Sequence, residues 1–192
     1  ELTKSISPYD GVYSRHMRNE GNNLLLSIEE TIKIGQGAET SIEISHHKVS
    51  GKDNWGLSEK STEMINEARD KGINVHSDQY PYIAGQSALF AIHQNNAFNE
   101  GEGGLGTVSG DKVIIAHAPL MPEYEGKKLS DICDDFDLPE QEAAEKILSQ
   151  DPHVLAIIEG MCEEDLVTIL SNPHTMIGSD GVPASGANPH PR

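Results

Sequence analysis

The amino-acid sequence predicts an α/β fold, a partial (β/α)8 TIM barrel. Two observations predict it. Strand-like and helix-like segments alternate along the 192 residues, and repeated strand–helix–strand units imply parallel strands with helical cover. Histidine and aspartate side chains also stand at the predicted strand ends. Reactive groups of parallel α/β sheets gather at that edge.

Each element follows from its hydrophobic period. Short apolar or alternating runs predict strands at residues 11–17, 40–47, 73–78, 112–116, 154–158 and 175–178. Apolar residues at helical spacing predict helices at residues 22–34, 58–71, 128–136, 140–148 and 163–170. Gly35 is expected to end the first helix, and Ser58 to cap the second. The acidic stretch 131–145 is expected to form a solvated helix pair.

Six strands are roughly two strand–helix units short of a complete barrel, which takes about 250 residues. We therefore expect residues 1–192 to form a single incomplete barrel domain that lacks the first strands and the end of the domain. An open doubly wound sheet is the alternative. Residues 94–111 are glycine-rich and are expected to be a flexible connection. Phosphate binding is the alternative role, but this segment lacks the Lys and Ser/Thr of a P-loop.

Composition excludes several classes of function. The formal net charge is −17, which argues against binding nucleic acid or an anionic membrane, because both need clustered cations. Apolar runs are too short to span a bilayer, and the start of the chain shows no secretory pattern. Cys133 and Cys162 do not make a disulfide framework in a chain of this size. A cytoplasmic location is the default expectation.

The histidines indicate a metal site. His16, His46, His76 and His117 each stand near the end of a predicted strand. His46 and His76 are 30 residues apart, which is one strand–helix–strand step. We therefore expect their imidazoles on adjacent strands at equal height, within reach of one cation at about 2.0–2.1 Å. His117 is expected to be a supporting or capping group.

Strand alternation refines this expectation, because successive side chains face opposite sides. His46 and His47 cannot both point inward, so one is a candidate ligand and the other packs or hydrogen-bonds outside. Asp180 lies between Gly178 and Gly181, where the chain can turn sharply. It is a candidate to bind metal or to move a proton; the alternative is a turn residue or a helix cap.

Several blocks resemble the N-acyl-D-amino-acid deacylases, the D-aminoacylase family of the metal-dependent amidohydrolase superfamily. The blocks occur in family order and are Tyr-Ser-Arg-His-Met-Arg-Asn-Glu at 13–20, Ile-Ser-His-His-Lys at 44–48, Asn-Trp-Gly at 54–56, Asp-Gln-Tyr-Pro-Tyr at 78–82, Met-Ile-Gly-Ser-Asp-Gly at 176–181 and Asn-Pro-His-Pro-Arg at 188–192. Any one block is weak evidence for the family, but the occurrence of all of them in family order is quite specific.

The resemblance implies a barrel with one or two zinc ions that hydrolyses a small-molecule N-acyl-D-amino acid to a carboxylate and a D-amino acid. By position, it implies that His46, His76 and Asp180 bind metal and that Asp180 carries the proton to the leaving nitrogen. Zinc would polarise the amide carbonyl and activate water. Candidates to bind the substrate's carboxylate are Arg18, Lys48 and Tyr82.

The sequence also departs from the family. The family's His-x-His pair on its first strand, and its bridging ligand, have no counterpart in the 192 residues. We therefore expect the isolated chain to be inactive and its unpaired strand edges to favour self-association. The alternatives are another amidohydrolase, such as a dihydroorotase- or hydantoinase-like cyclic amidase, a catalytically silent barrel domain, and phosphate or nucleotide binding by the glycine run.

Overall fold

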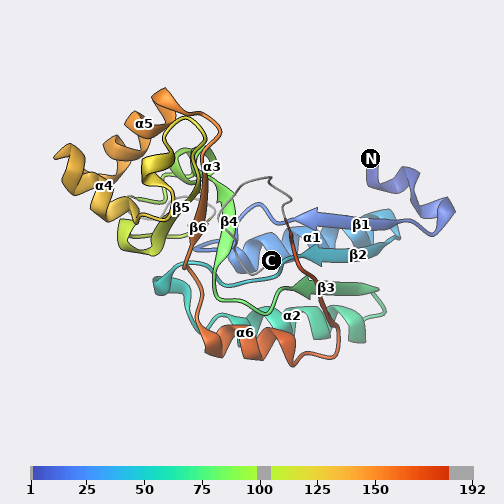
Figure 1. The fold of residues 1–192 in the computed structure, drawn as a ribbon. Coiled ribbons are helices and arrows are strands. Elements are labelled where there is room, and N and C mark those ends of the chain that lie inside the picture. Colours follow the sequence, from blue (N-terminus) through green and yellow to red (C-terminus); the bar gives the residue numbers. More distant parts are fainter. Residues whose placement is uncertain (1, 99–104, 182–192) are drawn as a thin grey trace.

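A four-stranded parallel sheet forms one half of the molecule. The computed structural model describes residues 2–98 and 105–181 (Figure 1). The strand order is β1-β2-β3-β7, with bounds β1 Val12–His16, β2 Ser41–Ser45, β3 Val75–Gln79 and β7 Thr175–Ile177. All three pairings are parallel. The carboxyl ends of these strands therefore meet at one edge of the sheet.

Three helices cover this sheet, and they are α1 Leu24–Ala38, α2 Ser58–Asp70 and α6 Glu163–Leu170. The side chains of Ile42, Ile44 and Val75 are fully buried and share a core with residues of α1, α2 and α6. The residues between them, such as Glu43 and His76, are less buried. This alternation shows that the helices pack on one face of the sheet and leave polar residues on the other.

A second unit is inserted between β3 and α6. It contains an antiparallel sheet of order β4-β6-β5, with a hydrophobic core of its own. Its elements are β4 Gly85–Ala88, α3 Leu89–Gln94, β5 Val113–His117, α4 Leu129–Phe136, α5 Glu140–Gln150 and β6 Leu155–Ile158. Figure 1 shows this unit beside the parallel sheet. Short 3-10 turns complete the described chain at Leu2–Ser5, Ser7–Tyr9, Lys52–Asn54, Gly110–Lys112 and Pro122–Tyr124.

The mixed α/β class is confirmed, and each predicted strand and helix exists within a few residues of its expected bounds. The expectation of one parallel sheet is wrong, because the strands predicted at 112–116 and 154–158 pair antiparallel in the second unit. An apolar run does not encode the direction of its partner. β4 was not expected, because its sequence Gly-Gln-Ser-Ala has no apolar alternation. A single domain over 1–192 and a flexible connection at 94–111 stay predictions, and residues 99–104 lie outside the described residues.

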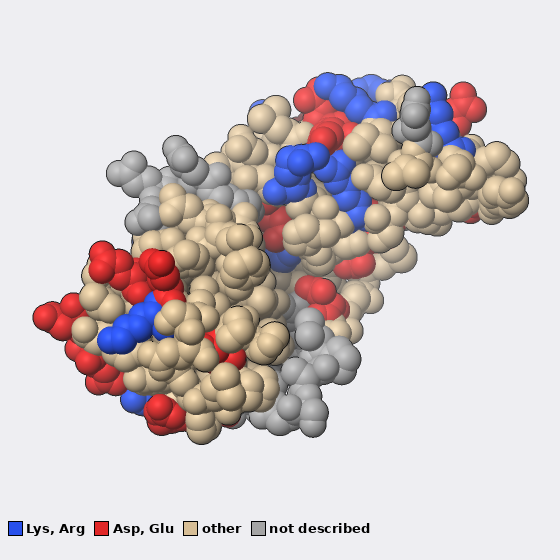
Figure 2. Space-filling model, turned by 90° about the horizontal axis from the view of Figure 1, so that it is seen from above, with Lys and Arg blue, Asp and Glu red and all other residues tan. Residues whose placement is uncertain are grey.

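Gly35 does not end the first helix. Helix α1 continues to Ala38 and ends at Glu39, which adopts the left-handed conformation. A Cβ atom on Gly35 would lie 2.1 Å from Cγ1 of Ile42, so the glycine lets the helix approach β2 closely. The expected solvated helix pair is present as α4 and α5, whose acidic side chains gather at one end of the molecule (Figure 2).

Helix α2 is capped by a residue from another helix rather than by Ser58. The buried carboxylate of Asp165, in α6, accepts hydrogen bonds from the backbone N–H groups of Gly56 and Ser58 at 2.9 and 3.3 Å. It also accepts one from the thiol of Cys162. A carboxylate at a helix N-terminus accepts hydrogen bonds from free N–H groups and interacts favourably with the positive end of the helix dipole. Asp165 therefore fastens α6 to the beginning of α2.

Replacing Asp165 with alanine is expected to lower the free energy of unfolding by about 2–4 kcal/mol, because a buried charged acceptor is lost and its donors are left unpaired. Asp165→Asn keeps one acceptor and should lose less. Urea denaturation of both variants measures the difference. A loss below about 0.5 kcal/mol in the alanine variant would show that the cap contributes little.

Two further observations concern the described residues. None of their helices has the length and apolar character needed to cross a membrane. Cys133 and Cys162 are both free thiols.

Candidate metal centre

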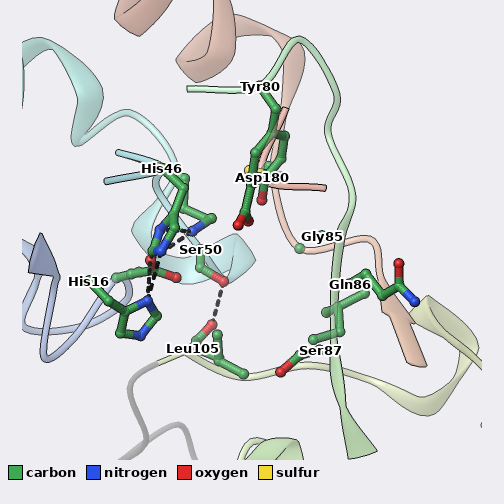
Figure 3. A pocket seen from close by; sticks show the side chains of 14 residues that line it. His16, His46, Ser50, Tyr80, Gly85, Gln86, Ser87, Leu105 and Asp180 are labelled. Carbon is green, nitrogen blue, oxygen red and sulfur yellow. Dashed lines mark hydrogen bonds and ion pairs between the residues drawn. The ribbon is translucent and has the colours of Figure 1, made fainter. Parts of the chain in front are cut away.

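Two histidines face each other at the carboxyl edge of the parallel sheet. His16 is the last residue of β1 and pairs in register with Ser45, the last residue of β2. His46 follows Ser45 directly, so the two imidazoles stand within one residue of the same height. Nδ1 of His16 lies 2.8 Å from Nε2 of His46, and the ring centroids are 4.6 Å apart. Figure 3 shows the two rings directed toward one another.

A buried carboxylate completes this group. Glu20 lies in the loop after β1, and its side chain is only 3% exposed. Its Oε1 lies 2.7 Å from Nδ1 of His46 and 4.0 Å from Nδ1 of His16. Among the described residues, the ligand atoms of His16, Glu20 and His46 form a group within 4.8 Å of one another. We call these three residues the His16–Glu20–His46 group.

The donor set suits a divalent transition metal. Imidazole nitrogen and carboxylate oxygen are the ligands that zinc takes alongside thiolate. Two nitrogens bound to one tetrahedral zinc at 2.0–2.1 Å lie roughly 3.4 Å apart. The 2.8 Å separation of the two ring nitrogens therefore needs only a small opening to admit an ion. The residues present fit a metal centre on this ground.

The backbone at this edge is held in an uncommon conformation. His46 has a φ of 40° and Asp180 a φ of 46°, which is the left-handed region that non-glycine residues rarely occupy. Such a conformation costs on the order of 1–3 kcal/mol and persists where the surroundings enforce it. The backbone N–H of His46 donates to Oδ1 of Asp78 at 2.8 Å. This bond helps to hold the residue in place.

The group opens onto a cavity of about 190 Å³ between the two units (Figure 3). Asp180 lines this cavity together with both histidines. The segments that follow β2 and β3 also contribute Lys48 and Tyr80, with the Lys48 ammonium 5.7 Å from the centre of the Tyr80 ring. The remaining lining residues are Glu20, Ser50, Gly85, Gln86, Ser87, Leu105, Ile158, Gly160 and Met161. Ionisable side chains thus lie beside apolar ones such as Leu105, Ile158 and Met161 in one cavity.

His76 does not join this group, so the expectation that His46 and His76 stand at equal height is wrong. His76 is the second residue of β3 and is paired in register with Glu43. His46 therefore lies three residues further along, about 10 Å at the usual strand rise. Nε2 of His76 lies 3.0 Å from the guanidinium of Arg69. Desolvation and this cation lower the pKa of His76.

The other expected site residues take different places. His47 points away from the cavity, as strand alternation predicts, and its buried Nε2 bonds to Ser61 of α2 at 2.9 Å. Burial lowers the pKa of His47 to about 4. Arg18 is 73% exposed and pairs with Glu30, and Tyr82 is not among the residues that line the cavity. His117 lies in the second unit, 3.0 Å from Glu125.

Sequence reasoning missed His16 and Glu20 as partners of His46. A signal was present, because His16 precedes His46 by the same 30 residues that separate His46 from His76. Spacing alone does not choose between these pairs. The register of three strands decides it, and the register depends on pairing that a single sequence does not reveal.

The pKa of Glu20 predicts a pH-dependent contribution to stability. Burial by itself raises this pKa, but the Lys48 ammonium and the His46 hydrogen bond outweigh it and lower the pKa to about 2 from 4.5. A carboxyl whose pKa is lower in the folded state stabilises it above the unfolded pKa, and this stabilisation is lost as the pH falls. We expect the difference in unfolding free energy between the wild type and Glu20→Gln to shrink from pH 5 to pH 2.5. Urea denaturation at both pH values measures it, and a constant difference would contradict the assignment.

The described residues thus define an α/β protein with a candidate metal centre at the carboxyl edge of its parallel sheet. No family model matches the chain. The chain is nevertheless a homologue of N-acyl-D-amino-acid deacylases, which confirms the resemblance seen in the sequence. D-aminoacylase from Alcaligenes xylosoxydans xylosoxydans is 32% identical over 192 residues, which are all of this chain and 36% of that protein. N-acyl-D-glutamate deacylase from the same organism is 28% identical over 191 residues, again 36% of that protein.

Solved structures of deacylases are also similar to this chain. N-acyl-D-glutamate deacylase from Bordetella bronchiseptica, in complex with zinc and a phosphonate inhibitor, matches with a TM-score of 0.79 at 28% identity, over 94% of this chain and 34% of that one. A D-aminoacylase described as defining a novel subset of amidohydrolases matches with a TM-score of 0.78 at 31% identity, over 93% of this chain and 34% of that one. A binuclear metal centre is described in D-aminoacylase. The chain spans about a third of the length of the relatives it matches.

Proposed function

We propose that this chain is part of a zinc-dependent deacylase that hydrolyses N-acyl-D-amino acids to a carboxylate and a D-amino acid. The observation that carries the proposal is the pair of ring nitrogens of His16 and His46, 2.8 Å apart at the mouth of a cavity that Asp180 also lines. The relatives named as deacylases supply the reaction class.

Each residue has a separate role in the proposed reaction. His16, His46 and Asp180 would hold zinc, which when bound supplies a Lewis acid and a water acidic enough to act as a nucleophile. The carboxylate of Asp180 takes a proton from the attacking water and returns it to the departing nitrogen. The proton that the water loses to Asp180 is the one that the departing amine gains, so Asp180 ends the reaction as a carboxylate again. His76 has no part in this proposal.

Lys48 is the proposed binding group for the substrate's α-carboxylate. Among the described residues that line the cavity, no other is a Lys or an Arg. The Lys48 ammonium is also largely buried. A buried ammonium binds a carboxylate more strongly than an exposed one. Tyr80 lines the cavity and replaces Tyr82 as the proposed aromatic wall, while Arg18 is left out because it faces solvent beside Glu30.

We also propose that the parallel sheet is an arc of a (β/α)8 barrel. The support is that α1, α2 and α6 cover one face, while the other face carries polar side chains such as Ser14 and Glu43. Barrels of this class place their sites at the carboxyl edge of the strands. In the strand order, β1 and β7 lie at the edges of the sheet, and self-association through these edges is part of the same proposal. A cytoplasmic location stays a prediction.

Turnover by the protein that carries this chain tests the proposed function. We expect release of a free amino acid from N-acetyl-D-amino acids, much less from the L-forms, loss of activity with a chelator and recovery with zinc. Hydrolysis of dihydroorotate or a hydantoin instead would favour a cyclic amidase. Tight zinc binding with no turnover of any of these amides would favour a catalytically silent domain.

A further inference from the structure

Three polar atoms form a tight triangle behind the metal-facing side of His46. Nδ1 of His46, Nζ of Lys48 and Oε1 of Glu20 lie 2.7–2.8 Å from one another. All three side chains are largely buried, with exposed fractions of 12%, 10% and 3% for His46, Lys48 and Glu20. Water therefore does not take over these contacts, and the three groups must satisfy one another.

The triangle allows two arrangements of one proton. An ammonium can only donate, whereas a neutral imidazole carries its proton on one nitrogen and accepts on the other. In the first arrangement, Nδ1–H of His46 donates to Glu20, and Nε2 keeps a lone pair. In the second, Lys48 donates to a bare Nδ1, and the proton lies on Nε2. Nε2 is the atom that faces His16, so only the first arrangement leaves it ready to bind a cation.

We propose that Glu20 selects the tautomer of His46, holding its proton on Nδ1 against the competing donor Lys48. In the first arrangement both bonds to the Glu20 carboxylate are charge-assisted. In the second, a bare Nδ1 of His46 would face the carboxylate oxygen 2.7 Å away with no proton between them, so the carboxylate favours the first. In this proposal Glu20 acts as a positioning residue for His46 rather than as the third ligand that its place in the His16–Glu20–His46 group would also allow. Its one oxygen also fixes the spacing between the proposed metal ligand and the proposed substrate-binding ammonium.

The local structure supports a fixed position for Glu20. The backbone carbonyl of Glu20 accepts from the N–H of Ser50 at 2.8 Å, which ties its loop to the segment that carries Lys48. The preceding residue, Asn19, accepts from the N–H groups of Gly21 and Asn23 through its side-chain oxygen. The carboxylate therefore projects from a loop that is anchored on both sides.

The experiment compares five proteins without zinc and then with it. They are the wild type, Glu20→Gln, Lys48→Met and the double variant, with Glu30→Gln as the control because Glu30 also joins two cations, Arg15 and Arg18. Long-range ¹H–¹⁵N spectra near pH 8 report which nitrogen of His46 is protonated. Competition with a chelator reports the zinc affinity.

We expect the proton on Nδ1 in the wild type, in Lys48→Met and in the control, and on Nε2 in Glu20→Gln. Zinc affinity should fall about 10- to 100-fold in Glu20→Gln. The same substitution should cost less when Lys48 is already methionine, because the competing donor is gone. Glu20→Gln leaves a buried ammonium unpaired and could fail to fold. In that case, comparing the His46 tautomer in Lys48→Met with that in the double variant still tests the role of the carboxylate.

Two results would overturn the inference: a proton on Nε2 in the zinc-free wild type, or a Glu20→Gln effect that is the same with and without Lys48. The inference rests on the proposed metal site, but the two fail separately. A wild type that shows Nδ1–H and binds no zinc would contradict the proposed function and leave the tautomer assignment standing.

Discussion

Replacing His16 with alanine is expected to weaken zinc binding by roughly 100- to 1,000-fold. The free energy of binding a structural zinc is about 10–16 kcal/mol and is shared among about four ligands, so one ligand accounts for roughly 3 kcal/mol. The His16 side chain is 72% exposed, so its removal should leave the fold intact. Isothermal titration or chelator competition on the protein that carries this chain measures the effect.

His76→Ala is the matched comparison for this prediction. His76 is also a strand residue with a partly exposed imidazole, but it contacts Arg69 and not the His16–Glu20–His46 group. We expect its zinc affinity to stay within a few-fold of the wild type. If His76→Ala weakened binding as strongly as His16→Ala, the register of β2 and β3 would not describe the metal site.

The second large effect is expected at Asp180. Asp180→Asn keeps the size of the side chain and removes its ability to take a proton, so kcat for an N-acetyl-D-amino acid should fall by about 10²- to 10⁴-fold. The Michaelis constant should change much less, because the substrate's carboxylate is assigned to Lys48. Steady-state kinetics at saturating zinc separates the two parameters.

Asp111→Asn serves as the control, because Asp111 lies in the second unit outside the cavity. It should leave kcat unchanged. A kcat for Asp180→Asn within tenfold of the wild type would remove Asp180 from the proton transfer. A large rise in the Michaelis constant with unchanged kcat would instead place Asp180 in substrate binding.

The sequence was sufficient to predict the fold class and most of the elements, but not β4 and α3. Hydrophobic period located the strands and helices because burial on one face leaves a pattern along the chain. It also predicted that His46 and His47 point to opposite sides, which the buried bond from His47 to Ser61 confirms. These are local properties, set by residues that are neighbours in sequence.

The pairing of the site residues was not predictable in the same way. The strand predicted at 73–78 lies at Val75–Gln79, and this shift of one or two residues moves His76 from the end of its strand to the beginning. Pairing with Glu43 then sets its height in the sheet. Glu20 reaches His46 only through the fold of the loop after β1. Register and loop conformation depend on contacts between distant segments.

An anomalous difference map collected at the zinc absorption edge, from crystals of the zinc-loaded protein, tests the central assignment most directly. We expect one strong peak at about 2.0–2.1 Å from ring nitrogens of both His16 and His46, with Asp180 beside it and Glu20 hydrogen-bonded to Nδ1 of His46. A peak bound to His76, or a site near His46 that leaves His16 free, would contradict the assignment.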